Sequence, residues 1–179
     1  MTAAHLNQQK TLPDTRLLAR AWALENLPND AAIAVDMPHL SPDLPMARGQ
    51  VERLRARMKE IGHPRENYYR LLLASNKIPA KTFWLYRIKR TPLQLKDLEG
   101  RTERSYQAVD TVDPEAGAGA WARQGILFAI MSDYGPDLQE QWPRLGEELQ
   151  RKSIELRRFE PRPGQIQGPY IRVYRLNRH

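Results

Sequence analysis

Apolar residues at the start of the chain are spaced as in an amphipathic helix and then run together as in a buried strand. Between residues 14 and 27 they recur every three or four positions, with Asp14 placed to cap a helix and Pro28 placed to end it. Residues 31–36 are almost all apolar, a run too short for a surface helix, and several prolines follow. We therefore expect a helix at 14–27 and a buried strand at 31–36 that leads into a long loop.

The next segment has the pattern of two helices and a strand. From Ala47 to Ile61 apolar residues recur at alternating intervals of four and three, and Gly62 supplies a C-terminal stop. Pro64 suits the first turn of a second helix. Residues 82–89 are rich in aromatic and β-branched types and alternate between two faces, which is typical of a half-buried strand.

The second half of the chain predicts a central strand and a terminal hairpin. Residues 91–124 are polar and rich in Ala and Gly after Pro114, so we expect a mobile loop there. Residues 126–131 are apolar at every position, which is typical of a strand covered on both faces. A helical stripe contains Pro143, where the regular helix is expected to start. Two further strands, 153–159 and 170–176, are close enough in sequence to pair antiparallel.

Together these elements predict the α/β class, with a mixed sheet of about four or five strands, helices packed on its faces and a C-terminal antiparallel hairpin. At 179 residues the chain can bury one sizeable core. We expect a flexible segment at 1–12 and a single domain at 13–179.

Composition narrows the classes of partner and chemistry. The absence of cysteine excludes disulfides and thiolate catalysis, and fits either a reducing cytosol or a bacterial extracytoplasmic space. No stretch reaches the roughly 18 to 20 apolar residues that a membrane helix needs, so the chain as given is expected to be soluble. The formal charge of +7 favours an anionic partner, although a dispersed solvated surface explains the charge equally well.

The candidate ligand-binding residues stand at the ends of two predicted strands. Asp36 ends the first strand, and Ser132, Asp133 and Tyr134 follow the central one. Ligands enter open α/β sheets at the carboxyl ends of strands, although strand-end turns are the simpler interpretation of these residue types. The chain contains neither the Gly-x-Ser-x-Gly elbow of a catalytic serine nor a phosphate-binding glycine loop, so we name no catalytic residue and no cofactor.

Two other groups of residues allow a functional and a structural interpretation. Asp36, His39 and Asp43 could ligate a metal, but a proline-rich loop commonly carries such residues without one, and we expect no metal. The aromatic and basic residues of 81–90 have the composition of a single-stranded nucleic-acid binder, but a strand with one core face and one wet face fits them better.

The last two strands carry many arginines. They are Arg157, Arg158, Arg162, Arg172, Arg175 and Arg178. If the strands pair, several guanidinium groups share one surface, which could contact anionic lipid or phosphate. A solvated edge that prevents aggregation between strands explains them equally well.

Several short patterns along the chain recur together in one known family. They are Asp14 to Arg16 with Ala19 and Trp22, residues 26–28, 33–36, 125–132 with Tyr134, Pro161 and 168–176. These patterns resemble the soluble C-terminal domain of polytopic bacterial glycosyltransferases. The family is similar to dolichyl-phosphate-mannose protein mannosyltransferases and lipid-A aminoarabinose transferases, which take a sugar from a polyprenyl-phosphate donor. Residues 46–90 and 91–124 have no counterpart in the resemblance.

The resemblance implies a non-catalytic domain on the extracytoplasmic side of a bacterial inner membrane, with a structural or acceptor-recognition role. The catalytic acid of such enzymes lies in a loop between early membrane helices, outside this chain. The implied partners are the membrane part of the parent protein, an anionic lipid surface, and a glycan or polyprenyl-phosphate sugar acceptor. The alternatives are a stand-alone module for a nucleotide-sugar or phosphorylated glycan, and a nucleic-acid-binding protein, which is the less expected of the two.

Overall fold

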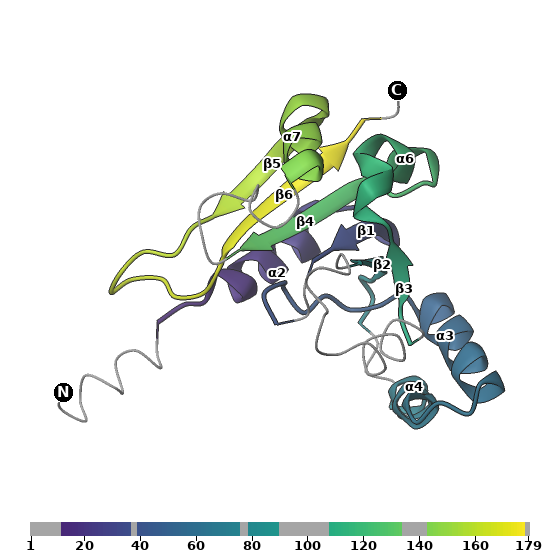
Figure 1. Ribbon diagram of the computed structural model, residues 1–179. Coiled ribbons are helices and arrows are strands. Elements are labelled where there is room, and N and C mark those ends of the chain that lie inside the picture. Colours follow the sequence, from purple (N-terminus) through teal and green to yellow (C-terminus); the bar gives the residue numbers. More distant parts are fainter. Residues whose placement is uncertain (1–11, 37–38, 76–78, 90–107, 134–142, 178–179) are drawn as a thin grey trace, which may run out of the picture.

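The structure is a computed structural model that describes residues 12–36, 39–75, 79–89, 108–133 and 143–177 (Figure 1). Tyr134 and Arg178 lie outside the described residues, as do the N-terminal segment up to residue 11 and the first half of the predicted loop, 91–107. Within the described part, no helix is long and apolar enough to cross a membrane.

A mixed six-stranded sheet forms the centre of the molecule, in the order β3-β2-β1-β4-β6-β5. The strands are β1 (Ala31–Val35), β2 (Phe83–Ile88), β3 (Asp110–Val112), β4 (Phe128–Asp133), β5 (Ser153–Phe159) and β6 (Tyr170–Leu176). The first four are parallel to one another, and β6 runs antiparallel to both β4 and β5. The predicted α/β class, the mixed sheet and the C-terminal hairpin are confirmed, with slightly more strands than expected.

Five helices and one 3₁₀ turn surround the described sheet. They are α2 (Thr15–Asn26), α3 (Arg48–Glu60), α4 (Arg65–Ala74), η2 (Pro114–Ala116), α6 (Gly117–Arg123) and α7 (Pro143–Lys152). Asp14 caps α2 as predicted, because its side chain accepts a hydrogen bond from the amide of Arg16. α7 begins at the predicted Pro143. The expectation of a loop is wrong for residues 110–123, which form β3, η2 and α6.

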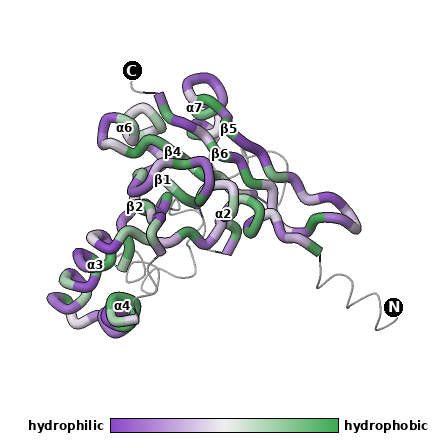
Figure 2. The backbone as a smooth tube through the Cα atoms, turned by 180° about the vertical axis from the view of Figure 1, so that it is seen from behind, coloured by the Kyte–Doolittle hydropathy of each residue, from purple (hydrophilic) through white to green (hydrophobic). Residues whose placement is uncertain are grey.

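Each face of the sheet has its own core. On one face, Ile33, Ile130 and Val173 pack with Ala19 and Ala23 of α2. The opposite face is covered by α6 and α7, and Trp121 of α6 is fully buried there. Figure 2 shows the hydrophobic strands in the middle of the sheet and the more hydrophilic edge strand β5 and helix α3. β4 is buried along its whole length, as its apolar sequence predicts.

The order in which strands are added to the sheet changes direction next to β1, and this change positions the candidate site. The chain passes from β1 to β2 through α3 and α4, and from β3 to β4 through α6 on the opposite face. The two neighbours of β1, which are β2 and β4, are therefore reached by connections on opposite faces of the sheet. In open α/β sheets such a switch point opens a crevice at the carboxyl ends of the two strands. Here those strands are β1 and β4.

Candidate anion-binding site

Asp36 and Ser132, predicted from strand ends, meet at the switch point between β1 and β4. The amide of Asp36 donates a 3.2 Å hydrogen bond to the carbonyl of Ile130, and the amide of Ser132 donates a 3.4 Å bond to Oδ2 of Asp36. The hydroxyl of Ser41 lies 3.5 Å from that of Ser132. Asp36 is only 1% exposed. These groups therefore form a buried polar floor rather than an open pocket.

The remaining predicted ligand residues do not join this floor as a group. Asp133 is buried at the end of β4, where it pairs with Tyr170 of β6. Tyr134 lies outside the described residues. In the described part of the chain, no cluster of three or more acidic or histidine side chains could hold a metal ion. His39 is exposed, and its carbonyl accepts a 2.8 Å hydrogen bond from Nη1 of Arg16.

Arg87 of β2 connects the buried floor to an open cavity. Its Nη1 donates a 2.9 Å hydrogen bond to the backbone carbonyl of Asp36. Burial lowers the pKa of Arg87, and the nearby carboxylates of Asp36 and Asp43 oppose this effect. An arginine stays protonated at neutral pH even when it is largely buried, because its intrinsic pKa lies far above neutrality. The structure thus holds a fixed positive charge at the base of the cavity.

We call this space the arginine cavity. It has a volume of about 440 Å³ and lies between α2 and α4, with residues 43–46 and β2 completing its wall. Its charged lining residues are Arg20, Asp43, Arg65 and Arg87. Three arginines against one aspartate give the lining a net positive charge, which favours an anionic ligand. The volume falls in the usual range for small-molecule sites.

Helix α2 fixes the loop that forms one wall of the arginine cavity. The guanidinium of Arg16 binds the Asp14 carboxylate through Nε and Nη2, at 2.9 and 2.6 Å. Arg20 Nε donates a 2.8 Å hydrogen bond to the carbonyl of Asp43. Together with the bond from Arg16 to His39, these contacts hold both ends of residues 39–43 against α2. The two hydrogen bonds that join the Arg16 guanidinium to the Asp14 carboxylate also fix the relative orientation of the two groups.

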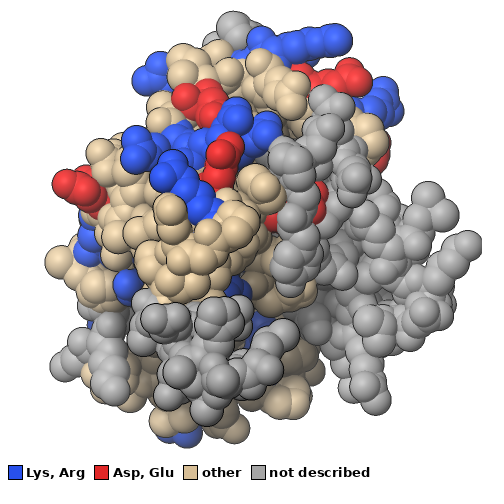
Figure 3. Space-filling model, turned by 90° about the vertical axis from the view of Figure 1, so that its left-hand side faces the viewer, with Lys and Arg blue, Asp and Glu red and all other residues tan. Residues whose placement is uncertain are grey.

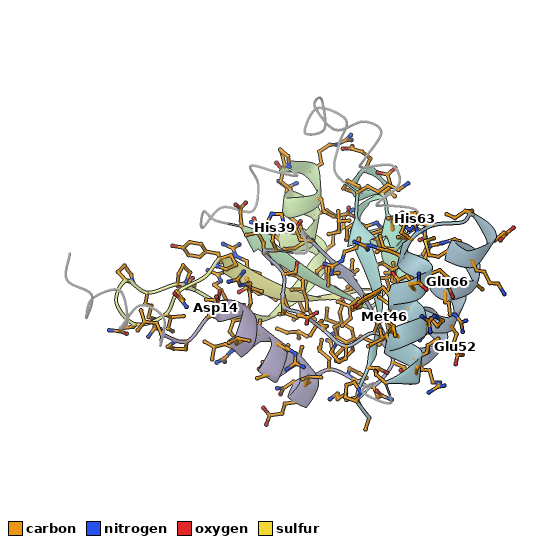
Figure 4. The ribbon with its side chains drawn as sticks, turned by 90° about the horizontal axis from the view of Figure 1, so that it is seen from below. Asp14, His39, Met46, Glu52, His63 and Glu66 are labelled. Carbon is orange, nitrogen blue, oxygen red and sulfur yellow. The ribbon has the colours of Figure 1, made fainter. Side chains whose placement is uncertain are left out.

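Helix α4 forms the opposite wall. Tyr69 is buried, and its hydroxyl donates a hydrogen bond to the carbonyl of Ala108. Burial raises the pKa of Tyr69, so this hydroxyl stays protonated at neutral pH. Arg65 and Tyr68 are exposed and line the mouth of the cavity. Figure 4 shows α2 on one side of the segment that carries Met46 and the α3–α4 pair on the other.

The start of α2 meets the segment that leads into β6 beside this site. The amide of Thr15 donates to the carbonyl of Gln167 at 2.9 Å, and the hydroxyl of Thr15 donates to the carbonyl of Pro169 at 2.7 Å. The amide of Gln167 in turn donates to the carbonyl of Pro13 at 2.9 Å. The patterns at residues 14–16 and 168–170, which carry part of the family resemblance, therefore form one structural unit.

The arginines of the terminal hairpin do not share one surface. In the β5–β6 register Arg158 lies opposite Arg172, on the face of Tyr174, whereas Arg175 lies on the face of Val173. Arg158 also pairs with Glu155 and Glu160. Figure 3 views the side on which this hairpin lies in Figure 1, and acidic side chains stand among the basic ones. The arginines of the two strands are therefore divided between the faces, with Arg158 and Arg172 on one and Arg157 and Arg175 on the other, and their contact with an anionic surface stays a prediction.

The aromatic side chains of β2 are also arranged differently from those of a nucleic-acid binder. Phe83 is fully buried in the sheet core, and Tyr86 packs against the core of the other face. Trp84 is half-buried, with the guanidinium of Arg53 stacked 5.1 Å from its ring centroid. Bases need open aromatic faces for stacking. The structural interpretation of this strand, with a core face and a wetter face, is the one that the packing supports.

Sequence reasoning missed the arginine cavity because its charges come from three distant elements. Arg20 belongs to α2, Arg65 to α4 and Arg87 to β2. Of the three, only Arg87 lies in a segment that the sequence indicated as a possible binding region, and there it was interpreted as part of a basic strand. Their convergence depends on the crossover through α3 and α4, which no local pattern encodes. Comparison of the chain with protein-family models, curated proteins and solved structures found no match.

Proposed function

We propose that the chain is a binding domain that holds a phosphate-bearing ligand in the arginine cavity. We further propose that it serves as a non-catalytic, extracytoplasmic domain of a membrane glycosyltransferase that uses a polyprenyl-phosphate sugar donor. The observation that carries the binding role is the convergence of Arg20, Arg65 and Arg87 on one cavity. The glycosyltransferase context rests on the sequence resemblance.

The chemistry of the cavity favours phosphate over an uncharged ligand. Arg87 is held in place by its bond to the carbonyl of Asp36, so little rotamer entropy would be lost when it binds an anion. Arginine presents several N–H donors in a planar fork, which matches the oxygens of a phosphate. Arg65 stands at the exposed mouth, where it can meet a ligand that enters from solvent.

The binding role is tested by calorimetric titration of the purified chain with glucose 1-phosphate, inorganic pyrophosphate and glucose. We expect saturable binding of the two phosphate compounds and none of glucose. Arg65→Gln should weaken phosphate binding roughly tenfold, because hydrogen bonds to charged groups contribute about 1.5 to 3 kcal/mol. Arg151→Gln is the matched control, since Arg151 is exposed on α7 and does not line the cavity.

Equal binding of glucose and glucose 1-phosphate, or equal effects of Arg65→Gln and Arg151→Gln, would contradict the binding role. The proposed context has a separate test. The purified chain is expected to transfer no sugar from a polyprenyl-phosphate donor, because the resemblance places the catalytic acid in a membrane loop. Turnover that is lost when one residue of this chain is substituted would refute that part of the proposal.

A further inference from the structure

Exposed apolar side chains flank the arginine cavity on both of its helices. Leu17 of α2 is 65% exposed, and Tyr68 and Leu71 of α4 are 60% and 59% exposed. Isolated exposed apolar residues are ordinary on a soluble protein. Here, however, Tyr68 lines the arginine cavity, and Leu71 stands three residues further along the same helix, on an adjoining part of its surface.

Leu17 belongs to the same region because a second cavity continues from the first. This cavity, of about 490 Å³, is lined by Leu17 and Arg16 and shares Arg20 and Asp43 with the arginine cavity. The two hollows therefore adjoin at Arg20. We define the α2–α4 face as Arg16, Leu17 and Arg20 of α2 with Arg65, Tyr68 and Leu71 of α4.

The α2–α4 face alternates cationic and apolar side chains in a way that suits one kind of partner. Leucine and tyrosine side chains together with arginines are typical of helices that lie at a bilayer surface. Arginine stems can remain among apolar groups while the guanidinium reaches phosphate. A bilayer with anionic headgroups offers phosphate and apolar chains at the same place, and so matches both kinds of side chain.

We propose that the α2–α4 face docks on an anionic phospholipid bilayer, with a headgroup phosphate in the arginine cavity and Leu17, Tyr68 and Leu71 among the headgroups. The inference rests on the proposed phosphate-binding role of that cavity and names the bilayer as the source of the phosphate. It also moves the expected lipid contact from the β5–β6 hairpin, whose arginines are divided between two faces, to α2 and α4.

Charge makes the other occupants of this face less suitable. A second copy of the chain would place the arginines of one α2–α4 face against those of the other, and like charges across an interface are costly. A nucleic acid would supply phosphates but would leave Leu17 and Leu71 without apolar contact. The anionic bilayer satisfies both groups.

The test is co-sedimentation of the chain with vesicles of phosphatidylcholine alone and of equal parts phosphatidylcholine and phosphatidylglycerol. We expect binding to the mixed vesicles only, weakened by salt. The double variant Leu17→Ser/Leu71→Ser should lose about tenfold in affinity, since burying a leucine contributes strongly to partitioning. Arg65→Gln should lose about fivefold, because each arginine near a charged bilayer contributes about that factor.

Two variants of the hairpin serve as matched controls. Ile154→Ser removes an exposed apolar side chain from β5, and Arg175→Gln removes an exposed arginine from β6. Both should leave vesicle binding unchanged. All the substituted residues are exposed, and a thermal unfolding scan checks that every variant is folded.

The inference is overturned if the chain binds both vesicle types equally, if the α2–α4 variants bind like the parent chain, or if the hairpin variants show the larger loss. Self-association that the double leucine variant abolishes, without vesicle binding by the parent chain, would assign the face to a second copy and overturn it as well. Binding of glucose 1-phosphate without vesicle binding would refute the bilayer inference while leaving the proposed phosphate-binding role intact. Failure of that titration would refute the phosphate-binding role itself.

Discussion

Gln50 is a buried side chain that takes the place of a strand residue. Its Nε2 donates to the carbonyl of Leu85 at 2.7 Å, and its Oε1 accepts from the amide of Leu85 at 2.8 Å. On the same edge of β2, residues 45–47 bond to Phe83, and β3 begins its pairing only at Tyr86. The glutamine amide thus fills the gap between two short backbone partners.

Replacing Gln50 by leucine should be strongly destabilising. Leucine keeps the apolar bulk but leaves the amide and carbonyl of Leu85 buried without partners, and each such group costs about 1 to 3 kcal/mol. We expect the free energy of unfolding in urea to fall by roughly 2 to 4 kcal/mol. Lys59→Leu, on the exposed face of the same helix, should change it by no more than about 0.5 kcal/mol. Similar effects for the two variants would show that the glutamine amide is not needed.

Gly168 and Gly164 separate steric crowding from backbone strain. Both have a positive φ, of 111° and 71°. A methyl group on Gly168 would lie 2.9 Å from Oδ1 of Asp14 and 3.1 Å from the amide nitrogen of Thr15, and closer still to the Thr15 hydroxyl, whereas a methyl group on Gly164 would meet nothing.

Gly164→Ala should therefore lower the free energy of unfolding only by the cost of holding an alanine in a left-handed backbone conformation, about 1 to 2 kcal/mol. Gly168→Ala should cost clearly more, because it also pushes α2 away from the start of β6. The comparison is made by urea unfolding of both variants, with the resonance of the Thr15 amide as a local reporter. Equal losses of stability would mean that the start of α2 and the segment before β6 are not packed as tightly as the structure shows.

At the residue scale, sequence predicted positions only where local rules apply. Asp36 and Ser132 were expected at strand ends, and they lie close together because β1 and β4 are parallel and end on the same edge of the sheet. Whether they bind a ligand stays a prediction. The arginine cavity could not be predicted, because the position of Arg65 depends on how α4 lies against residues 43–46.

At the scale of elements, α6 shows why a segment of helix was mistaken for a loop. Its sequence, Gly117–Arg123, is small and rich in glycine, and no side chain next to it caps its first turn. The cap comes from α7. Oε2 of Glu148 accepts a 3.0 Å hydrogen bond from the amide of Ala118, and Oε1 accepts a 3.3 Å bond from Gly119. The information that makes α6 helical therefore lies about thirty residues away along the chain.

Glu148→Ala should loosen α6 and lower the free energy of unfolding by roughly 1 to 2 kcal/mol, the cost of losing a good helix cap. Glu147→Ala, at the neighbouring exposed position, is the control and should have little effect. Hydrogen exchange at the amides of Ala118 and Gly119 gives the direct measurement. Unchanged protection of these amides in Glu148→Ala would rule out the cap.

Because β4 is buried and β5 is an exposed edge strand, we expect an aspartate to have different effects in the two strands. Phe128→Asp would place an unpaired carboxylate in the core, which costs several kcal/mol against a total stability of about 5 to 15 kcal/mol, so the domain should unfold. Ile154→Asp, on the exposed side of edge strand β5, should leave a cooperative thermal transition. A normal transition for Phe128→Asp would mean that β4 is not central.

On the scale of the whole molecule, sequence was most successful for elements and least successful for their order. The terminal strands have the predicted bounds, 153–159 and 170–176, because alternation and turn residues delimit them locally. The one described strand that the sequence did not predict is β3, because it has only three residues and a polar sequence, Asp110–Val112. β3 pairs with β2. This pairing and the crossover that follows β3 set the switch point, and no periodic pattern in the sequence reveals them.

The charged contact between Asp14 and Arg16 lies where α2 meets the segment before β6, and it gives the fold a predictable pH dependence. Asp14 accepts hydrogen bonds from Arg16, while Arg16 also binds the loop at His39, and the neighbouring Thr15 holds the start of β6. The hydrogen bond from the Arg16 side chain lowers the pKa of Asp14 below its usual 3.8, and partial burial opposes this shift. The ionised carboxylate is therefore favoured in the folded state over the unfolded state.

The sign of the pH effect follows from this lowered pKa. The stabilisation is fully present above the unfolded pKa of 3.8 and is lost as the pH falls through the lower folded value. In Asp14→Asn the amide oxygen can still cap α2, but the ion pair with Arg16 is gone. The stability difference between parent and variant, measured by urea unfolding, should be largest near neutral pH and shrink below 3.8. Glu60→Gln, at an exposed position on α3, should show a small difference that does not depend on pH in this way. A constant difference for Asp14→Asn across the range would mean that the charge of Asp14 does not stabilise the fold, and that the cap and the Thr15 bonds hold α2 to the start of β6 without it.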